Sequence, residues 1–119
     1  MEPPAALKIG ILANPGKKGA VKTLQALRSA LESRGCETVL DLQTAELVGE
    51  SGGIPVENFA REVDVVAVLG GDGTMLNAVL RLGDFEKPVA GINIGTLGFL
   101  TSCTDEELEI FAQSVADRE

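Results

Sequence analysis

The 119-residue sequence contains no histidine, tyrosine or tryptophan. Without histidine, the chain cannot supply a Ser-His-Asp triad or a histidine-ligated metal site. Without tyrosine and tryptophan, an aromatic platform for stacked bases is not expected. The two cysteines, Cys36 and Cys103, lie far apart and form no Cys-x-x-Cys pair. We interpret both as small hydrophobic residues of a reduced, cytoplasmic protein.

Basic residues are in the minority, with 10 Lys and Arg against 18 Asp and Glu and a formal net charge of −8. Because nucleic-acid binding needs a basic face, we expect no nucleic-acid partner. No apolar run approaches the roughly 18 residues that a membrane-spanning helix requires. The first residues also lack the basic region of a signal peptide. We therefore expect a protein that does not associate with membranes.

The most informative stretch begins with residues 63–69, which are apolar and valine-rich apart from Asp64. Such runs are typical of buried parallel strands. Residues 70–74 then read Gly-Gly-Asp-Gly-Thr, and helical spacing continues to residue 82. A strand, a glycine turn and a helix N-terminus together present free N–H groups and a favourable helix dipole to an anion. This stretch predicts a phosphate-binding loop.

Asp72 stands in the middle of this predicted loop, where its charge would repel a bare phosphate. Its presence is explained if the carboxylate holds a magnesium ion or accepts a proton from an attacking hydroxyl. The alternative is a structural aspartate that forms an Asx-turn or caps the helix.

The remaining sequence alternates between strand and helix patterns. Strands are predicted at residues 7–13, 37–42, 63–69 and 87–94, helices at 20–34, 74–82 and from 104 onward, and short helices on each side of a loop at 51–55. This alternation predicts a doubly wound α/β fold of the Rossmann-like kind, with a mostly parallel sheet and helices on both faces. Ligands of such sheets bind beyond the carboxyl ends of the strands. The glycine loops at 14–19, 70–73 and 95–98 are all expected there.

The first glycine loop nearly matches a Walker A motif, since residues 16–23 contain its first glycine and its Lys-Thr pair. Val21 replaces the second glycine, however, and a β-branched residue resists the required backbone conformation. We therefore reject a true P-loop. Lys17 and Lys18 either reach a phosphate or are solvated loop lysines. A dinucleotide fingerprint is also incomplete, because Leu76 occupies the place of its third glycine.

Two segments together resemble the NAD kinases. Residues 70–76 read Gly-Gly-Asp-Gly-Thr-Met-Leu, and residues 91–101 read Gly-Ile-Asn-Ile-Gly-Thr-Leu-Gly-Phe-Leu-Thr. The first element alone is shared with diacylglycerol and sphingosine kinases and with phosphofructokinases. The second element is the more specific one, and the resemblance covers most of the chain.

The resemblance implies transfer of a phosphoryl group from ATP or polyphosphate to the adenosine ribose 2′-hydroxyl of NAD, with Mg²⁺ or another divalent metal. Asp72 would be the proton acceptor, and we assign no metal-ligating side chain. The implied nucleotide-binding residues are Gly70, Gly71, Asp72, Gly73, Thr74, Asn77 and Phe99.

Two of these residues differ in what they can contribute. Asn77 stands where family members often carry a basic residue, so it keeps hydrogen bonding but supplies no charge. Phe99 stands where the family packs an aromatic residue near the NAD adenine. Plain core packing is an equal alternative for Phe99.

The resemblance to the NAD kinases implies a cleft between two domains, in which a β-rich second domain carries an Asn-acid dipeptide. No asparagine here is followed by Asp or Glu. We therefore expect residues 1–119 to be the N-terminal α/β phosphate-loop domain, inactive alone, of a protein that forms a homo-oligomer at full length. The alternatives are a lipid or sugar kinase that shares the Gly-Gly-Asp-Gly-Thr loop, and a non-catalytic nucleotide-binding module.

Overall fold

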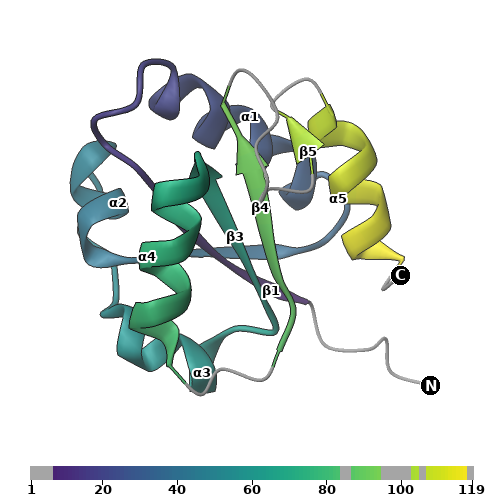
Figure 1. The fold of residues 1–119 in the computed structure, drawn as a ribbon. Helices are drawn as coiled ribbons and strands as arrows, with labels where there is room; N and C mark the ends of the chain where they lie inside the picture. Colours follow the sequence, from purple (N-terminus) through teal and green to yellow (C-terminus); the bar gives the residue numbers. More distant parts are fainter. Residues whose placement is uncertain (1–6, 84–86, 95–102, 105–106, 118–119) are drawn as a thin grey trace.

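A computed structural model describes residues 7–83, 87–94, 103–104 and 107–117. It contains a five-stranded sheet in the order β2-β1-β3-β4-β5, in which all neighbouring strands are parallel (Figure 1). The elements in chain order are β1 (Lys8–Ala13), α1 (Ala20–Glu32), β2 (Glu37–Leu40), α2 (Leu42–Leu47), the 3₁₀ helix η1 (Val56–Asn58), α3 (Phe59–Glu62), β3 (Val65–Gly70), α4 (Asp72–Leu82), β4 (Val89–Asn93), β5 (Cys103–Thr104) and α5 (Leu108–Ala116). The predicted doubly wound α/β fold is therefore confirmed.

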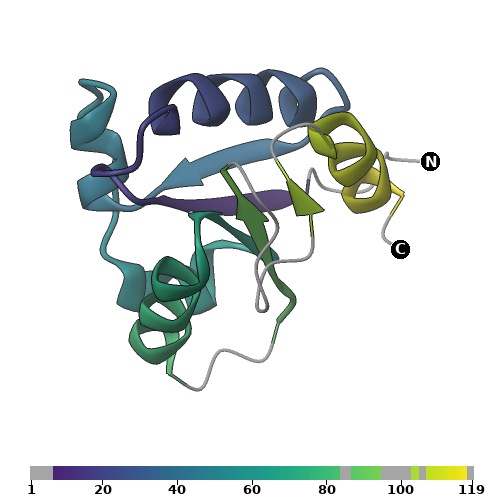
Figure 2. The same ribbon diagram turned by 45° about the horizontal axis from the view of Figure 1, so that its top comes forward.

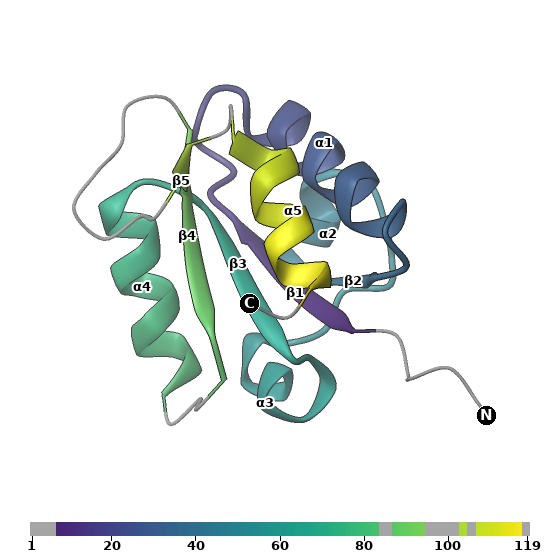
Figure 3. The ribbon, with the colours of Figure 1, turned by 90° about the vertical axis from the view of Figure 1, so that its right-hand side faces the viewer.

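Helices cover both faces of the sheet. Helices α1 and α5 lie on one face, and α4 lies on the other, as Figures 2 and 3 show from two directions. This arrangement follows from right-handed crossovers between parallel strands, which leave the chain on opposite faces when the strand order reverses. None of the helices within the described ranges is long and apolar enough to cross a membrane.

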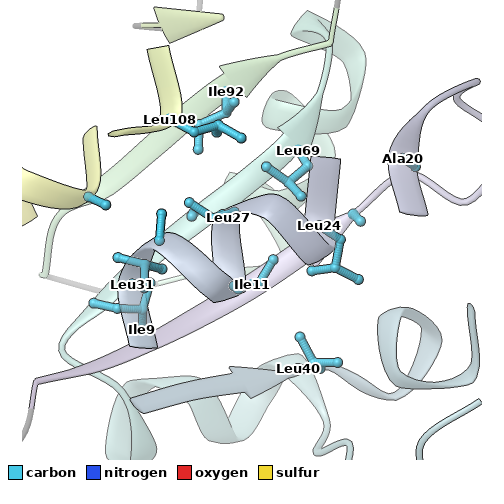
Figure 4. Close-up of a cluster of buried hydrophobic side chains, with 14 of the residues drawn as sticks. Ile9, Ile11, Ala20, Leu24, Leu27, Leu31, Leu40, Leu69, Ile92 and Leu108 are labelled. Carbon is cyan, nitrogen blue, oxygen red and sulfur yellow. The ribbon is translucent and has the colours of Figure 1, made fainter. Parts of the chain in front are cut away.

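The larger part of the core lies between α1 and the sheet. Leu24, Leu27 and Leu31 recur at spacings of three and four and are fully buried. Figure 4 shows them beside Ile9 and Ile11 of β1. The helix predicted from residue 20 is therefore confirmed, and its last turn is followed by Gly35 with φ +81°, a conformation that favours glycine.

The second predicted strand ends two residues earlier than expected. Residues 41 and 42 belong to the start of α2, because Asp41 caps that helix: the Thr44 amide donates to Asp41 Oδ1 at 3.1 Å. Aspartate is one of the residues preferred at a helix N-cap, where its carboxylate accepts a backbone N–H of the first turn. Short helices on each side of residues 51–55 agree with the prediction.

The short strand β5 was not predicted, because two residues carry no periodic pattern. One half of a capping box precedes the last helix, since the Thr104 amide donates to Glu107 Oε1 at 3.0 Å. The regular helix α5 begins at Leu108. Leu108 and Ala112 are buried, and the partly buried Phe111 and Val115 pack against the same core.

Strand β1 passes unusually close to the helical layer on the α4 side. A Cβ atom at Gly10 would lie 2.8 Å from Phe59 Cε2 and 3.2 Å from Val63 Cγ1. Phe59 and Val63 are both almost completely buried, so neither ring nor methyl group can move aside freely. Gly10 is therefore required by packing.

We expect Gly10→Ala to lower the free energy of unfolding by about 1–3 kcal/mol, the usual cost of overpacking a core. Gly52→Ala is the matched control, since a Cβ atom there meets no described atom within 4 Å. Urea unfolding of the two variants measures the difference. Equal midpoints would contradict this account of Gly10.

Candidate functional site

Strand β3 turns into helix α4 through two glycines. β3 ends at Gly70, Gly71 is the N-cap of α4, and Asp72 is its first residue. At Gly70, where φ is +158°, a Cβ atom would lie 2.5 Å from Thr74 Oγ1 and 2.8 Å from Thr74 Cβ. No side chain fits there without displacing the first helical turn. Gly70 therefore lets the helix begin directly at the end of the strand.

The two motifs that carry the resemblance meet at this turn. The register of β3 and β4 pairs Gly70 with Asn93, and the Ile94 amide donates to the Gly70 carbonyl at 3.0 Å. Asn93 is buried, and its Oδ1 lies 3.5 Å from the position of a Cβ atom on Gly71. This is an ordinary van der Waals distance, so the described packing does not require a glycine at position 71. The glycine loop at 95–98 and Phe99 lie outside the described residues.

A cavity of about 510 Å³ lies beside this turn, beyond the carboxyl ends of β1 and β3. Its wall is formed by Leu12, Ala13, Asn14, Pro15, Lys17, Asp41, Gln43, Gly71, Gly73, Thr74, Asn77, Ala78 and Arg81. After β1 the chain continues to β2 on one side, and after β3 it continues to β4 on the other. The cavity therefore lies at the point where the strand order reverses, which is the usual ligand site of open α/β sheets.

Some of the predicted phosphate-loop residues line the cavity, and others lie next to its wall. Gly71, Gly73, Thr74 and Asn77 line the cavity, whereas Gly70 and Asp72 do not. Asp72 is half-buried between two lining glycines, in the first turn of α4, where a carboxylate is favoured by the helix dipole. It is not the helix cap, since Gly71 occupies that position.

Gly73 has no packing role in the described part of the chain. A Cβ atom at this position would meet nothing within 4 Å among the described residues, and the backbone is regular helix. Glycine inside a helix costs about 0.5–1 kcal/mol relative to alanine. The packing of the described residues therefore does not require a glycine at position 73.

Hydrogen bonds fix the first glycine loop against the end of β3. The Asn14 amide donates to the Leu69 carbonyl at 3.0 Å, and Asn14 Oδ1 accepts from the Gly16 amide at 3.0 Å. The Lys17 amide donates to the Asn14 carbonyl at 3.1 Å. Of the two lysines, Lys17 lines the cavity and Lys18 lies in a separate surface depression.

Sequence reasoning missed two features of the cavity wall. One is the support from α2: the Ala13 amide donates to Thr44 Oγ1 at 3.0 Å, so the buried Asp41–Thr44 cap holds the end of β1. The other is Arg81, on the same face of α4 as Asn77. Because residues four apart lie on the same face of a helix, the spacing of Asn77 and Arg81 could have indicated from the sequence that Arg81 lies near the site.

The charge of the wall differs from that of the whole chain. Its described charged residues are two cations, Lys17 and Arg81, and one carboxylate, Asp41, which already accepts a hydrogen bond from the Thr44 amide. The protein as a whole carries a net charge of −8. Among the described residues, no group of three or more Asp, Glu, Cys or His side chains is placed to hold a metal ion. The side chains that line the cavity thus include more cations than carboxylates, unlike the chain as a whole.

Comparison with solved structures supports the fold. The crystal structure of yeast NADH kinase complexed with NADH superposes with a TM-score of 0.78, covering 96% of this chain and 39% of that one at 20% identity. At this identity the likeness shows a shared fold.

Sequence comparison identifies the family. The NAD kinase of Wolinella succinogenes is 34% identical over 116 residues, which are 97% of this chain and 40% of that protein. The NAD kinase of Azotobacter vinelandii is 38% identical over 112 residues, 92% of this chain and 38% of that protein. The chain thus spans about 40% of the length of these relatives. The family model described as the ATP-NAD kinase N-terminal domain matches residues 9–119, and the chain belongs to this family.

Proposed function

We propose that the protein containing this domain phosphorylates the adenosine ribose 2′-hydroxyl of NAD to give NADP, with ATP or polyphosphate as donor. The observation that carries the proposal is the cavity at the strand-order reversal, lined by Gly71 and by the packing-free Gly73. Backbone N–H groups at the start of an eleven-residue helix suit a phosphate group. The family relatives named NAD kinase favour NAD as the acceptor.

In this proposal the glycine turn and the first turns of α4 hold the phosphates. Gly71 and Gly73 contribute backbone N–H groups, while Thr74 and Asn77 contribute side-chain hydrogen bonds from the cavity wall. Gly70 acts indirectly, by allowing the helix to start at the end of β3. Phe99 is assigned to the adenine side of NAD on the resemblance alone.

Asp72 is proposed as the general base. Its carboxylate accepts the proton of the ribose 2′-hydroxyl as that oxygen bonds to the terminal phosphorus of the donor. The bond between this phosphorus and the bridging oxygen breaks, and ADP or a shortened polyphosphate leaves. A position between Gly71 and Gly73 places the carboxylate next to the groups proposed to hold the phosphates. Proton removal of this kind contributes about 10²–10⁴-fold to a rate.

A divalent metal fits this site only together with the donor. Mg²⁺ binds to proteins through one or two carboxylates and completes its coordination with substrate phosphates and water. The described residues offer no larger acidic cluster, and Asp72 is the carboxylate next to the cradle. When bound, the metal would neutralise charge on the donor phosphates. We propose Mg²⁺ or another divalent metal in that role.

The full-length protein is proposed to be a cytoplasmic homo-oligomer, in which a second, β-rich domain forms the other wall of the cleft. The share of the relatives' length that this chain spans, about 40%, supports the second domain. Because phosphoryl transfer requires the hydroxyl to be held within about 3–3.5 Å of phosphorus with water excluded, residues 1–119 alone are proposed to be inactive. A non-catalytic domain that binds nucleotides is the second candidate, favoured by the absence of Asp72 from the described cavity wall.

Asp72→Asn in the full-length protein should lower kcat by about 10²-fold or more and leave the affinity for NAD within a few-fold, since a lost base acts in the transition state. Asp117→Asn is the control, because Asp117 is an exposed residue just after α5. NADP formation with Mg-ATP or polyphosphate measures both variants. Turnover by the Asp72 variant close to that of the control would rule out Asp72 as the base.

Gly73→Ala should fold with unchanged or slightly higher stability, because its Cβ atom meets no described atom and alanine favours a helix. If a phosphate approaches the backbone here, the added methyl group should weaken donor binding, and we expect at least about a tenfold rise in the KM for the donor. Thermal unfolding and steady-state kinetics test both parts. An unchanged KM for ATP and for polyphosphate would show that no ligand contacts this glycine.

A further inference from the structure

Arg81 is a cation on the cavity wall that the role of the glycine turn leaves unexplained. It shares one face of α4 with Thr74, Asn77 and Ala78, all of which line the cavity. Its side chain is exposed, and the ion pairs within the described residues involve Arg28 and Arg34 instead. Lys17, on the loop after β1, lines the same cavity. Cations from two separate elements therefore border one space.

The length of α4 separates Arg81 from the glycine turn. Arg81 follows Gly73 by eight positions, which is about 12 Å along a helix that rises 1.5 Å per residue. Helical side chains slant toward the N-terminus, so the guanidinium lies nearer the turn than its Cα atom does. Even so, a single phosphate seated on the N–H groups of Gly71 and Gly73 is too short to reach Arg81 as well. A chain of two or more phosphates spans this distance.

We propose that Arg81 and Lys17 bind the distal phosphates of an extended oligophosphate whose other end lies at the glycine turn. The ligand class is a chain of at least two phosphates, whether part of a nucleotide or inorganic. A guanidinium suits this role because its planar fork donates two hydrogen bonds to one phosphate group. The inference rests on the proposed function, which puts phosphates at Gly71 and Gly73, and it adds a residue that selects for chain length.

The wall also contains the carboxylate of Asp41, which would oppose an anion at close range. That carboxylate is buried and accepts the Thr44 amide at the N-terminus of α2. The helix cap partly compensates its charge. Two cations therefore line the cavity together with one capped carboxylate, while Asp72 lies beside the glycine turn and not on the wall. The two lining cations favour a polyanion that extends from the turn along α4.

Isothermal titration of residues 1–119 with orthophosphate, pyrophosphate and tripolyphosphate tests the proposal. Arg81→Gln should weaken tripolyphosphate binding by about tenfold, as expected for a lost charged hydrogen bond, and should change orthophosphate binding by less than about twofold. Arg61→Gln is the matched control, since Arg61 is an exposed arginine on α3 that does not line the cavity. It should change neither affinity. Arg81→Lys should recover only part of the lost tripolyphosphate affinity, because an ammonium group lacks the planar pair of N–H donors of a guanidinium.

The possible failures are distinguishable. Equal weakening of orthophosphate and tripolyphosphate by Arg81→Gln would show a general charge effect and overturn the proposal. Unchanged tripolyphosphate affinity would overturn it as well. In both cases a wild-type chain that still binds phosphate leaves the proposed function intact. A wild-type chain that binds none of the three anions would contradict the phosphate-binding turn itself, and with it both proposals.

Discussion

Strand β3 passes into helix α4 through Gly70 and Gly71, and the space around this turn is too small for a side chain at Gly70. A Cβ atom there would lie 2.5 Å from Thr74 Oγ1. The same residue pairs with Asn93 of β4 and accepts the Ile94 amide. The first turn of α4, the end of β4 and the end of β3 are thereby fixed relative to one another. The cavity wall and the position of Asp72 both depend on this contact.

The strands and helices of the core could be predicted because their residues carry a clear period. The valine-rich run before Gly70 and the leucines of α1 gave the correct elements, and the alternation of strand and helix gave the correct sheet. The ends of elements were less accurate. Asp41 was included in a strand, whereas its side chain caps the next helix. A cap depends on one hydrogen bond, which no periodic pattern reveals.

The candidate site was predicted only where a motif marked it. Gly71, Gly73, Thr74 and Asn77 line the cavity, and the turn-rich loop after β1 brings Lys17 there. Arg81 and the Asp41–Thr44 pair were missed, because they reach the cavity through the packing of α4 and α2 against β1 and β3. Such residues belong to no motif and become visible only when the elements are placed in space. The role of Phe99 stays a prediction, since residues 95–102 are outside the described part.

The central claim is that phosphate binds at the turn between β3 and α4, inside the cavity at the strand-order reversal. Backbone amide signals of ¹⁵N-labelled residues 1–119, followed by NMR during titration with tripolyphosphate, test it most directly. The account predicts that the largest shifts occur at Gly71, Gly73 and Thr74, with smaller shifts in the loop around Lys17. Shifts confined to other surfaces, or no shifts at the glycine turn at saturating tripolyphosphate, would contradict it.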